Sequence, residues 1–468
     1  MRTWYRFIPP VVAVGVLIVI VGMVGLQGRI AHEEGELDES LLPPLLTEQP
    51  PGAGASPKIV LRAPTAPLPL RPISPPVSFE QANHALGFRY RSEIFEATAE
   101  KPKVVGYARR GTYLKTGKRI YGPGCSGGRW YPVPGGGHVC TKRGFLVDKS
   151  KPKRWIRQRA ATLTGVLPYR YARLKEPEAP RLFRVPTTRE VKLMAQAAAG
   201  KSPWPDVVDK RMKGIFFVAL DRIEGGSHYR TIRGRYVHKD HLRHLTAPAM
   251  RGQLLDRDNQ LPLVFVYGED SPIYRLEQKR LAKVGKAEKH ARFPLRRIFD
   301  HEGRKLVEGP DSIVLPRDNV RIVRRIARPD RIPDNVKWIH VDLSEQSLVA
   351  YKDERPVFAT LVSSGKEGFE PPIGVFRVVS KRLSITMNGP DPDDGWYEVE
   401  EVPWTQYYWE SYALHGAYWH NDFGKPRSHG CTNLAPTDAR WLFTWTDPRL
   451  PEGWHGALGS GTHVTFSG

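Results

Sequence analysis

The chain has 468 residues, and its 71 lysines and arginines exceed its 49 aspartates and glutamates to give a formal net charge of +22 at pH 7. A chain of this length exceeds what one hydrophobic core supports, so several domains are expected. In a cytosolic protein the charge would suit nucleic acid, but no nucleic-acid-binding motif accompanies it, and we expect no nucleic-acid partner. Outside the cytoplasm the same charge favours anionic lipid headgroups and carboxylate-rich polymers. A solvated basic surface is the simpler alternative.

An apolar segment lies at the start of the chain. No charged residue occurs from Phe7 to Gln27, and about 20 such residues span a bilayer. Arginines precede this segment and several acidic residues follow it. Because positive residues stay on the cytoplasmic side, residues 1–27 are predicted to form a cytoplasmic tip and a transmembrane anchor, with the remainder exported. A cleaved signal peptide is the alternative, although no Ala-x-Ala site follows the apolar segment.

Prolines recur through residues 28–90, which we interpret as an extended linker. Residues 91–150 contain short apolar runs between glycine-rich turns, a pattern that predicts a small β-barrel. This region is similar to the bacterial Src-homology-3-like module found beside many cell-wall enzymes. Cys125 and Cys140 are a plausible disulfide in an oxidising compartment, which leaves Cys431 as the odd cysteine of three.

Residues 151–330 carry the least information, and we interpret them as a mixed α/β scaffold or a wall-binding region. A capping box at Thr187–Glu190 predicts a helix through Ala199. Strands are expected at residues 215–220, 263–267 and 319–323. The sequence of residues 233–237 resembles that of residues 110–114, so a degenerate repeat of the first barrel is possible.

Residues 331–468 alternate apolar and polar residues, which predicts a β-sandwich. The expected strands are a hairpin over residues 338–351, followed by residues 358–363 and 375–379. Residues 388–395 are rich in turn formers and are expected to form a loop. A short helix is predicted from Pro436 to Trp445, with proline and an aspartate in its first turn.

Two short segments in this last region carry the chemistry, residues 414–420 and residues 427–433. They bring three histidines and Cys431 close together in sequence, with Gly416 and Gly430 directly beside a histidine and the cysteine. A thiol is a useful nucleophile only as thiolate, and a nearby imidazole is the usual base. Glycine lets the backbone approach a ligand and direct N–H groups at an oxyanion. We therefore interpret Cys431 as a nucleophile.

The pattern His-Gly, a spacer and Ser-His-Gly-Cys-x-Asn resembles the signature of the L,D-transpeptidase (YkuD-like) catalytic domain of bacterial cell-wall enzymes. Cys431 follows His415 by 16 residues, within the usual range of that family. Residues 338–348 and 372–376 resemble the family's opening strands and its Pro-x-Gly-x-Phe turn. The resemblance covers about residues 333–467. It implies a mainly β fold: a C-terminal β-sandwich with short helices, preceded by the barrel-like modules and the transmembrane helix.

The resemblance also implies roles for the site residues. His415 would take the thiol proton of Cys431, and the Gly416 carbonyl would fix the imidazole tautomer. The backbone N–H groups of His429, Gly430 and Cys431 would form the oxyanion hole. The side chains of Ser428, His429 and Asn433 would shape the loop or touch substrate, and Tyr418 and Trp419 would line the cleft. His420 is expected at the surface or rim. Neither a cofactor nor a metal is implied.

The implied reaction is acyl transfer from a peptidoglycan stem peptide. Cys431 would form a thioester with the third stem residue and release D-Ala, and an amine of a neighbouring stem would then form a 3→3 cross-link. Water as acceptor would make the enzyme an L,D-carboxypeptidase, and a protein lysine would give protein attachment. The expected location is the inner membrane, with the catalytic domain periplasmic.

Two hypotheses of other classes remain open. His415, His420, His429 and Cys431 could be ligands of a zinc hydrolase, although their spacing matches no common zinc pattern. Alternatively, the protein could be a non-catalytic tether between membrane and wall. The intact histidine and cysteine motif argues against a tether.

Overall fold

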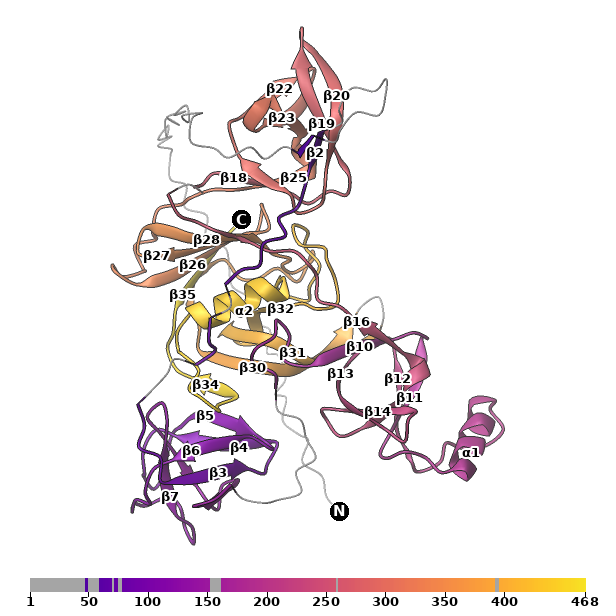
Figure 1. Cartoon of the computed structure of the whole chain (residues 1–468), viewed down its shortest axis with the longest axis vertical. Coiled ribbons are helices and arrows are strands. Elements are labelled where there is room, and N and C mark those ends of the chain that lie inside the picture. The colour runs from indigo at the N-terminus through magenta and orange to yellow at the C-terminus, as the bar shows by residue number, and fades with distance from the viewer. Residues whose placement is uncertain are drawn as a thin grey trace, which may run out of the picture. The chain divides into compact units, whose positions relative to one another are not determined.

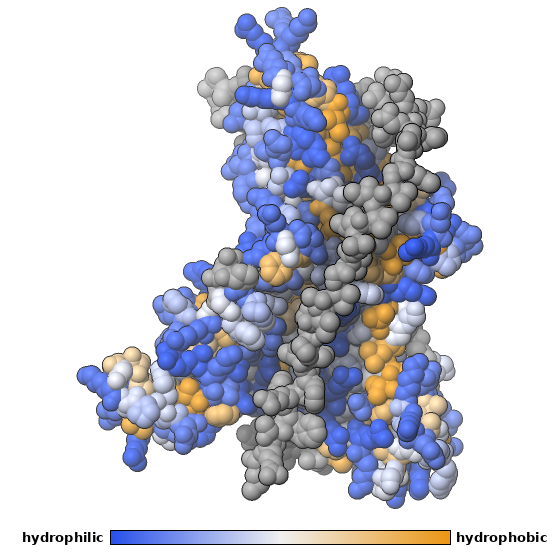
Figure 2. Space-filling view, turned by 180° about the vertical axis from the view of Figure 1, so that it is seen from behind, coloured by the Kyte–Doolittle hydropathy of each residue, from blue (hydrophilic) through white to orange (hydrophobic). Residues whose placement is uncertain are grey.

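The computed structural model describes residues 47–48, 59–69, 71–74, 78–151, 161–257, 260–391 and 395–468. These residues form five β-sheets and two α-helices, so the expectation of a mainly β protein is confirmed (Figure 1). The predicted transmembrane anchor lies outside the described residues. Within the described ranges, no helix has the length and hydrophobicity needed to cross a bilayer. Hydrophilic residues dominate the face seen in Figure 2.

The first module, residues 78–148, consists of seven short strands. Two sheets, ordered β6-β3-β9 and β5-β4-β8-β7, enclose Phe145 and Phe95. A disulfide joins Cys125 and Cys140 beside Phe95 and Trp130. The strands are β3 Asn83–Gly87, β4 Arg91–Phe95, β5 Val104–Arg109, β6 Tyr113–Thr116, β7 Trp130–Val133, β8 Gly137–Cys140 and β9 Phe145–Asp148.

This module begins earlier than the sequence predicted, because β3 lies before residue 91 and pairs with both β6 and β9. The linker prediction is therefore wrong for residues 83–87. The apolar Ala85 and Leu86 of β3 are buried between the partner strands, and this burial favours a central strand over an extended linker. The likeness to a Src-homology-3-like module stays a prediction.

The second module, residues 161–257, is also built mainly of strands. Its helix α1 begins as predicted, since Thr187 Oγ1 accepts from Glu190 N at 3.3 Å while Thr187 N donates to Glu190 Oε2 at 2.8 Å. The elements are β10 Arg170–Leu174, β11 Glu178–Leu182, α1 Thr188–Ala198, β12 Val208–Lys213, β13 Ile215–Glu224, β14 His228–Thr231, β15 Tyr236–His238, the 3-10 helix η2 Lys239–His241, β16 Leu242–Leu245 and β17 Gln253–Leu254.

The third module, residues 260–325, has a 3-10 helix directly before its last strand. Its elements are β18 Leu263–Val266, β19 Ser271–Glu277, β20 Arg280–Ala287, β21 Arg292–Pro294, β22 Arg297–His301, β23 Arg304–Glu308, η3 Pro310–Ser312, β24 Val314–Pro316, η4 Arg317–Asn319 and β25 Val320–Val323. Strands dominate the described part of residues 151–330, which also holds helix α1, and the interpretation of this region as a scaffold or a wall-binding region stays a prediction.

A segment from the predicted linker completes the third module. Strand β2, Ile59–Leu61, pairs in parallel with β20, and β1, Thr47–Glu48, pairs with β2. Ile59 and Leu61 are buried in the module's core. This apolar triplet therefore belongs to a folded sheet, and the linker prediction is wrong for residues 59–61.

The C-terminal region, residues 333–468, is a two-sheet sandwich. One sheet has the order β17-β28-β27-β26-β35-β29, and the other contains β31-β30-β34 with β32 and β33. The elements are β26 Lys337–Asp342, β27 Ser347–Lys352, β28 Arg355–Leu361, β29 Gly374–Arg377, β30 Ser380–Asp391, β31 Gly395–Trp409, β32 Tyr412–Gly416, β33 Thr432–Leu434, α2 Pro436–Trp445, β34 Gly456–Leu458 and β35 His463–Ser467.

Helix α2 lies in the core of this region and has the predicted bounds. Trp441 stacks on Phe358 of β28 at 4.2 Å between ring centroids, and Phe443 packs against Trp404 of β31 at 5.7 Å. The helix thus contacts both sheets. The loop predicted at residues 388–395 is mostly strand, because β30 continues to Asp391 and β31 begins at Gly395.

The largest sheet joins three of these regions. Strand β13 of the second module pairs in parallel with β31, and β5 of the first module pairs with β34. Buried charges reinforce both junctions. Arg109 makes a bidentate contact with Glu401 at 3.1 and 3.0 Å, with side chains only 7% and 0% exposed, and Arg181 pairs with Glu398 at 2.8 Å. This sheet places the second module beside the strands that carry the histidine and cysteine motif.

Candidate active site

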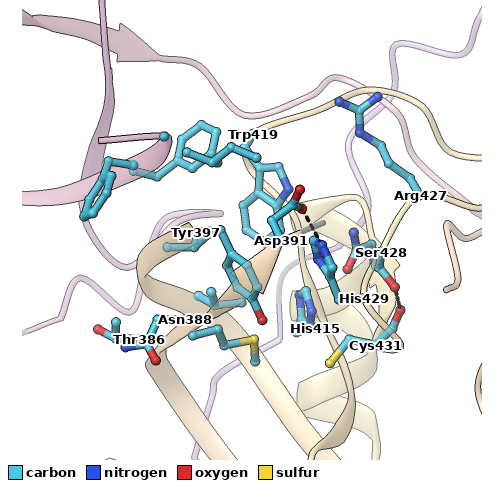
Figure 3. A pocket seen from close by; sticks show the side chains of 18 of the residues that line it. Thr386, Asn388, Asp391, Tyr397, His415, Trp419, Arg427, Ser428, His429 and Cys431 are labelled. Atoms are coloured by element: carbon cyan, nitrogen blue, oxygen red, sulfur yellow. Dashed lines mark hydrogen bonds and ion pairs between the residues drawn. The ribbon is translucent and has the colours of Figure 1, made fainter. Parts of the chain in front are cut away.

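Two parallel strands bring the predicted base and nucleophile together. The ladder of β32 and β33 pairs Leu414 with Thr432 and His415 with Asn433. Cys431 immediately precedes β33, so the ladder places it near the start of the strand that carries His415. Both residues line a cavity of about 870 Å³ (Figure 3). The structure therefore brings these two predicted site residues to one cavity.

The surroundings of His415 define its protonation state. Its side chain is 2% exposed, and burial lowers its pKa to about 4, so the imidazole is neutral at pH 7. Its Nδ1 lies 3.3 Å from the Gly416 carbonyl oxygen. A carbonyl only accepts, so Nδ1 carries the proton and Nε2 presents a lone pair. The contact expected from the sequence is present, and its catalytic role stays a prediction.

Cys431 is held as a thiol. Burial raises its pKa to about 11, against the opposing effect of a hydrogen bond from the Ala413 backbone. Its Sγ donates to the Ser411 carbonyl at 3.6 Å. Because Cys125 and Cys140 are paired, Cys431 is the free cysteine of the described residues. At neutral pH the pair is therefore thiol and neutral imidazole, and a proton must move as sulfur attacks.

The loop before Cys431 is closed by Ser428. Its Oγ accepts from Gly430 N at 3.1 Å and donates to the Cys431 carbonyl. Gly430 has φ +123°, and an added Cβ would lie 2.9 Å from the Tyr412 ring, so the position requires glycine. Because the Gly430 N–H already donates to Ser428, its expected place in the oxyanion hole is corrected.

His429 is positioned by a residue that the sequence did not single out. Its Nε2 lies 2.5 Å from Asp391 Oδ2, and its ring stacks on Tyr397 at 4.8 Å (Figure 3). Asp391 lies in the segment that the sequence predicts to be a loop, and no sequence motif links it to His429. The contact orients the ring at the cavity wall.

Asn433 and His420 form a polar contact next to the loop that precedes Cys431. The Asn433 side-chain amide lies 3.0 Å from His420 Nε2, and His420 Nδ1 accepts from Asp422 N at 3.2 Å. His420 is only 8% exposed, so the expectation of a rim residue is wrong. The reason is this pair of hydrogen bonds, which satisfy the ring inside the protein.

The two aromatic residues after the His-Gly pair have different environments. Trp419 lines the cavity, 5.8 Å from the His415 ring. Tyr418 is 1% exposed, stacks on Tyr171 at 3.8 Å and donates to the Glu400 carbonyl at 2.9 Å. The expectation that Tyr418 lines the cleft is therefore corrected, since its ring fills the junction with the second module.

The cavity has a second wall that sequence reasoning missed. Arg173 and Glu176 of the second module line it, as do residues 214–217 at the start of β13. Nothing in the local sequence indicates that these residues meet the motif. Their position follows from the pairing of β13 with β31.

The arrangement does not suit the zinc site considered above. Both ring nitrogens of His420 and Nε2 of His429 lie within hydrogen-bond distance of protein groups. Across the described ranges, no group of three or more His, Cys, Asp or Glu side chains could hold a metal ion.

Comparisons with known proteins place this geometry in context. No curated protein matches the chain. Solved structures similar to it include an Enterococcus faecium L,D-transpeptidase with a cysteine replaced by serine, at 26% identity, TM-score 0.25, and coverage of 31% of this chain and 55% of that one. The catalytic domain of the E. faecium L,D-transpeptidase acylated by ertapenem is 27% identical over 29% of this chain and 99% of that one, at TM-score 0.24.

An L,D-transpeptidase from Mycobacterium smegmatis is 17% identical, covering 37% of this chain and 82% of that one at TM-score 0.24. The chain spans about half the length of the first of these structures. Residues 336–463, which include every motif residue from His415 to Asn433, match YkuD, the L,D-transpeptidase catalytic domain.

Proposed function

We propose that the protein is a peptidoglycan L,D-transpeptidase with Cys431 as nucleophile and His415 as base. One observation carries the proposal: a neutral imidazole whose Nε2 keeps its lone pair shares a cavity with the free thiol. The match of residues 336–463 to the catalytic domain supports the same conclusion.

In the first step, His415 Nε2 takes the Cys431 proton as sulfur attacks the carbonyl between the third stem residue, usually diaminopimelate, and the terminal D-Ala. Backbone N–H groups of His429 and Cys431 would stabilise the oxyanion, each worth about 3–4 kcal/mol of barrier. The C–N bond then breaks, the imidazolium protonates the leaving amine, and D-Ala departs. A thioester remains on Cys431.

In the second step, a side-chain amine of a neighbouring stem attacks the thioester. His415 takes a proton from that amine and returns one to the departing sulfur, which yields a 3→3 cross-link and the free thiol. Water in place of the amine gives an L,D-carboxypeptidase, and a protein lysine gives protein attachment. These alternatives differ only in the acceptor.

We also propose that residues 1–27 anchor the chain in the inner membrane, with the catalytic domain periplasmic. The apolar segment with preceding arginines supports this location. Because β1, Thr47–Glu48, and β2, Ile59–Leu61, belong to a sheet of the third module, the proposed spacer shortens to residues 28–46.

Mass spectrometry with the full-length protein tests the function. Incubation with a tetrapeptide-bearing wall fragment should release D-Ala, add the acyl group to Cys431 and give a dimer when amine acceptors compete with water. Cys431→Ser should retain its fold and form no acyl-enzyme. Unchanged turnover in that variant would refute the assignment. By resemblance to the family, a carbapenem should also acylate Cys431.

A further inference from the structure

The second wall of the cavity is an extension of the catalytic sheet. The parallel ladder of β13 and β31 pairs Ile215 with Tyr397 and Phe217 with Val399, and all four residues line the cavity. In a parallel pair, opposite residues project from the same face. The second module thus continues the surface beside the nucleophile without a gap in the sheet.

This accessory wall, defined as Arg173, Glu176, Ile215 and Phe217, carries two opposite charges. Arg173 of β10 lies directly opposite Phe217 of β13 in their ladder. Glu176 follows in the turn after β10, and both charged residues are exposed and line the cavity. The wall therefore offers a cation and an anion above an apolar surface.

A short series of contacts links this wall to the proposed base. The Phe217 ring lies 6.0 Å from that of Trp419, and Trp419 lies 5.8 Å from His415. Figure 3 shows Trp419 between the strands of the second module and the residues around His415. A ligand whose scissile bond lies at Cys431 can therefore extend along Trp419 toward Arg173.

We propose that the accessory wall is a subsite for the side chain of the third stem residue of the donor, when that side chain ends in an ammonium and a carboxylate on one carbon. Arg173 binds the carboxylate, Glu176 binds the ammonium, and Phe217 packs on the methylene groups. The inference rests on the proposed function and names a specificity device for the same site.

The chemistry favours the donor over the acceptor. The acceptor amine must reach the thioester and lose its proton there, so it cannot stay paired with Glu176. The donor side chain takes no part in bond making, and both of its charges remain available. A planar guanidinium matches a carboxylate with two parallel hydrogen bonds, which makes Arg173 the selective element.

Two synthetic tetrapeptide donors test the subsite with the full-length protein. They differ only at the third residue, which is diaminopimelate in one and lysine, lacking the second carboxylate, in the other. The readout is kcat/KM for D-Ala release. The wild type should prefer the diaminopimelate donor by about two- to fivefold, because an ion pair made by an exposed arginine contributes only modest free energy in water.

Arg173→Gln should lower kcat/KM for the diaminopimelate donor to about the value for the lysine donor, and it should leave kcat/KM for the lysine donor nearly unchanged. Glu176→Gln should lower kcat/KM for both donors. The matched control is Arg189→Gln, which removes the same charge from an exposed position on α1 of the same module and should alter neither donor. Carbapenem acylation, which involves no such side chain, should proceed equally in all variants.

The outcomes separate the subsite from the reaction. D-Ala release with unchanged donor selectivity in Arg173→Gln overturns the subsite and leaves the transpeptidase intact. An equal loss for both donors also overturns it, because Arg173 would then act only on the fold or the general field. Absence of any acylation in the wild type overturns the proposed function, and the subsite with it.

Discussion

The two walls of the cavity treat charge in opposite ways. On the catalytic wall, His415 is buried and Cys431 is partly buried, and their pKa values of about 4 and about 11 make both groups neutral at pH 7. On the accessory wall, Arg173 and Glu176 are exposed to solvent. Proton transfer within the neutral pair creates charge only during reaction, whereas exposed charges are already present to select a ligand. The difference fits the proposed roles, in which one wall carries the chemistry and the other recognises the donor.

The largest expected effect comes from removing the base on the catalytic wall. His415→Gln should slow carbapenem acylation of Cys431 by about 10²- to 10⁴-fold, because the thiol then has no positioned group to take its proton. Intact-mass time courses measure this rate. Arg173→Gln is the control on the other wall and should acylate at the wild-type rate. If the two variants behave alike, the division between the walls fails.

The next prediction concerns the protonation state of the thiol. With a pKa of about 11, the thiolate fraction and hence iodoacetamide alkylation should rise about tenfold per pH unit, or about 1000-fold from pH 7 to pH 10. Alkylation is followed by peptide mass spectrometry, with circular dichroism confirming the fold at each pH. A preformed thiolate-imidazolium pair would instead give a nearly flat profile across this range.

A third prediction tests the seam between the walls. Glu400 of β31 is buried, accepts from Ala219 N of β13 at 3.0 Å, and burial raises its pKa to about 8. Because the folded pKa lies above the unfolded value of 4.5, its contribution to stability is fully present below pH 4.5 and is lost as the pH rises to about 8.

Glu400→Gln keeps the acceptor and removes the titration. It should therefore be more stable than the wild type at pH 9, on the order of a few kcal/mol, and differ little at pH 4.5. Denaturant melts at both pH values measure the difference. A constant offset between the two proteins at both pH values would show that Glu400 does not titrate at this seam.

The smallest effect is expected at the apolar part of the accessory wall. Phe217→Ala removes the ring packed on Trp419 and should lower kcat/KM about tenfold for both donors, without changing their ratio. Phe183→Ala is the matched control, since Phe183 is 49% exposed in the same module and does not line the cavity. A changed donor ratio in Phe217→Ala would contradict the separate role given to Arg173.

Local patterns in the sequence were enough to predict several elements. The capping box placed α1, proline and aspartate placed α2 from Pro436 to Trp445, and alternation placed most strands of the sandwich. The motif also pointed to His415 and Cys431, which the structure brings to one cavity, and their catalytic roles stay a prediction. In each case the interacting groups are neighbours in the chain or share one ladder.

Only the tertiary structure decided which residues meet across long separations. The pairing of β13 with β31 set the accessory wall, and the same junction buried Tyr418, which the sequence had placed in the cleft. Asp391, on strand β30, contacts His429, and Ile59–Leu61, which the sequence predicted to be linker, pairs with β20. Strand pairing between distant segments depends on complementary edges and shared burial, and neither leaves a periodic signal in the local sequence.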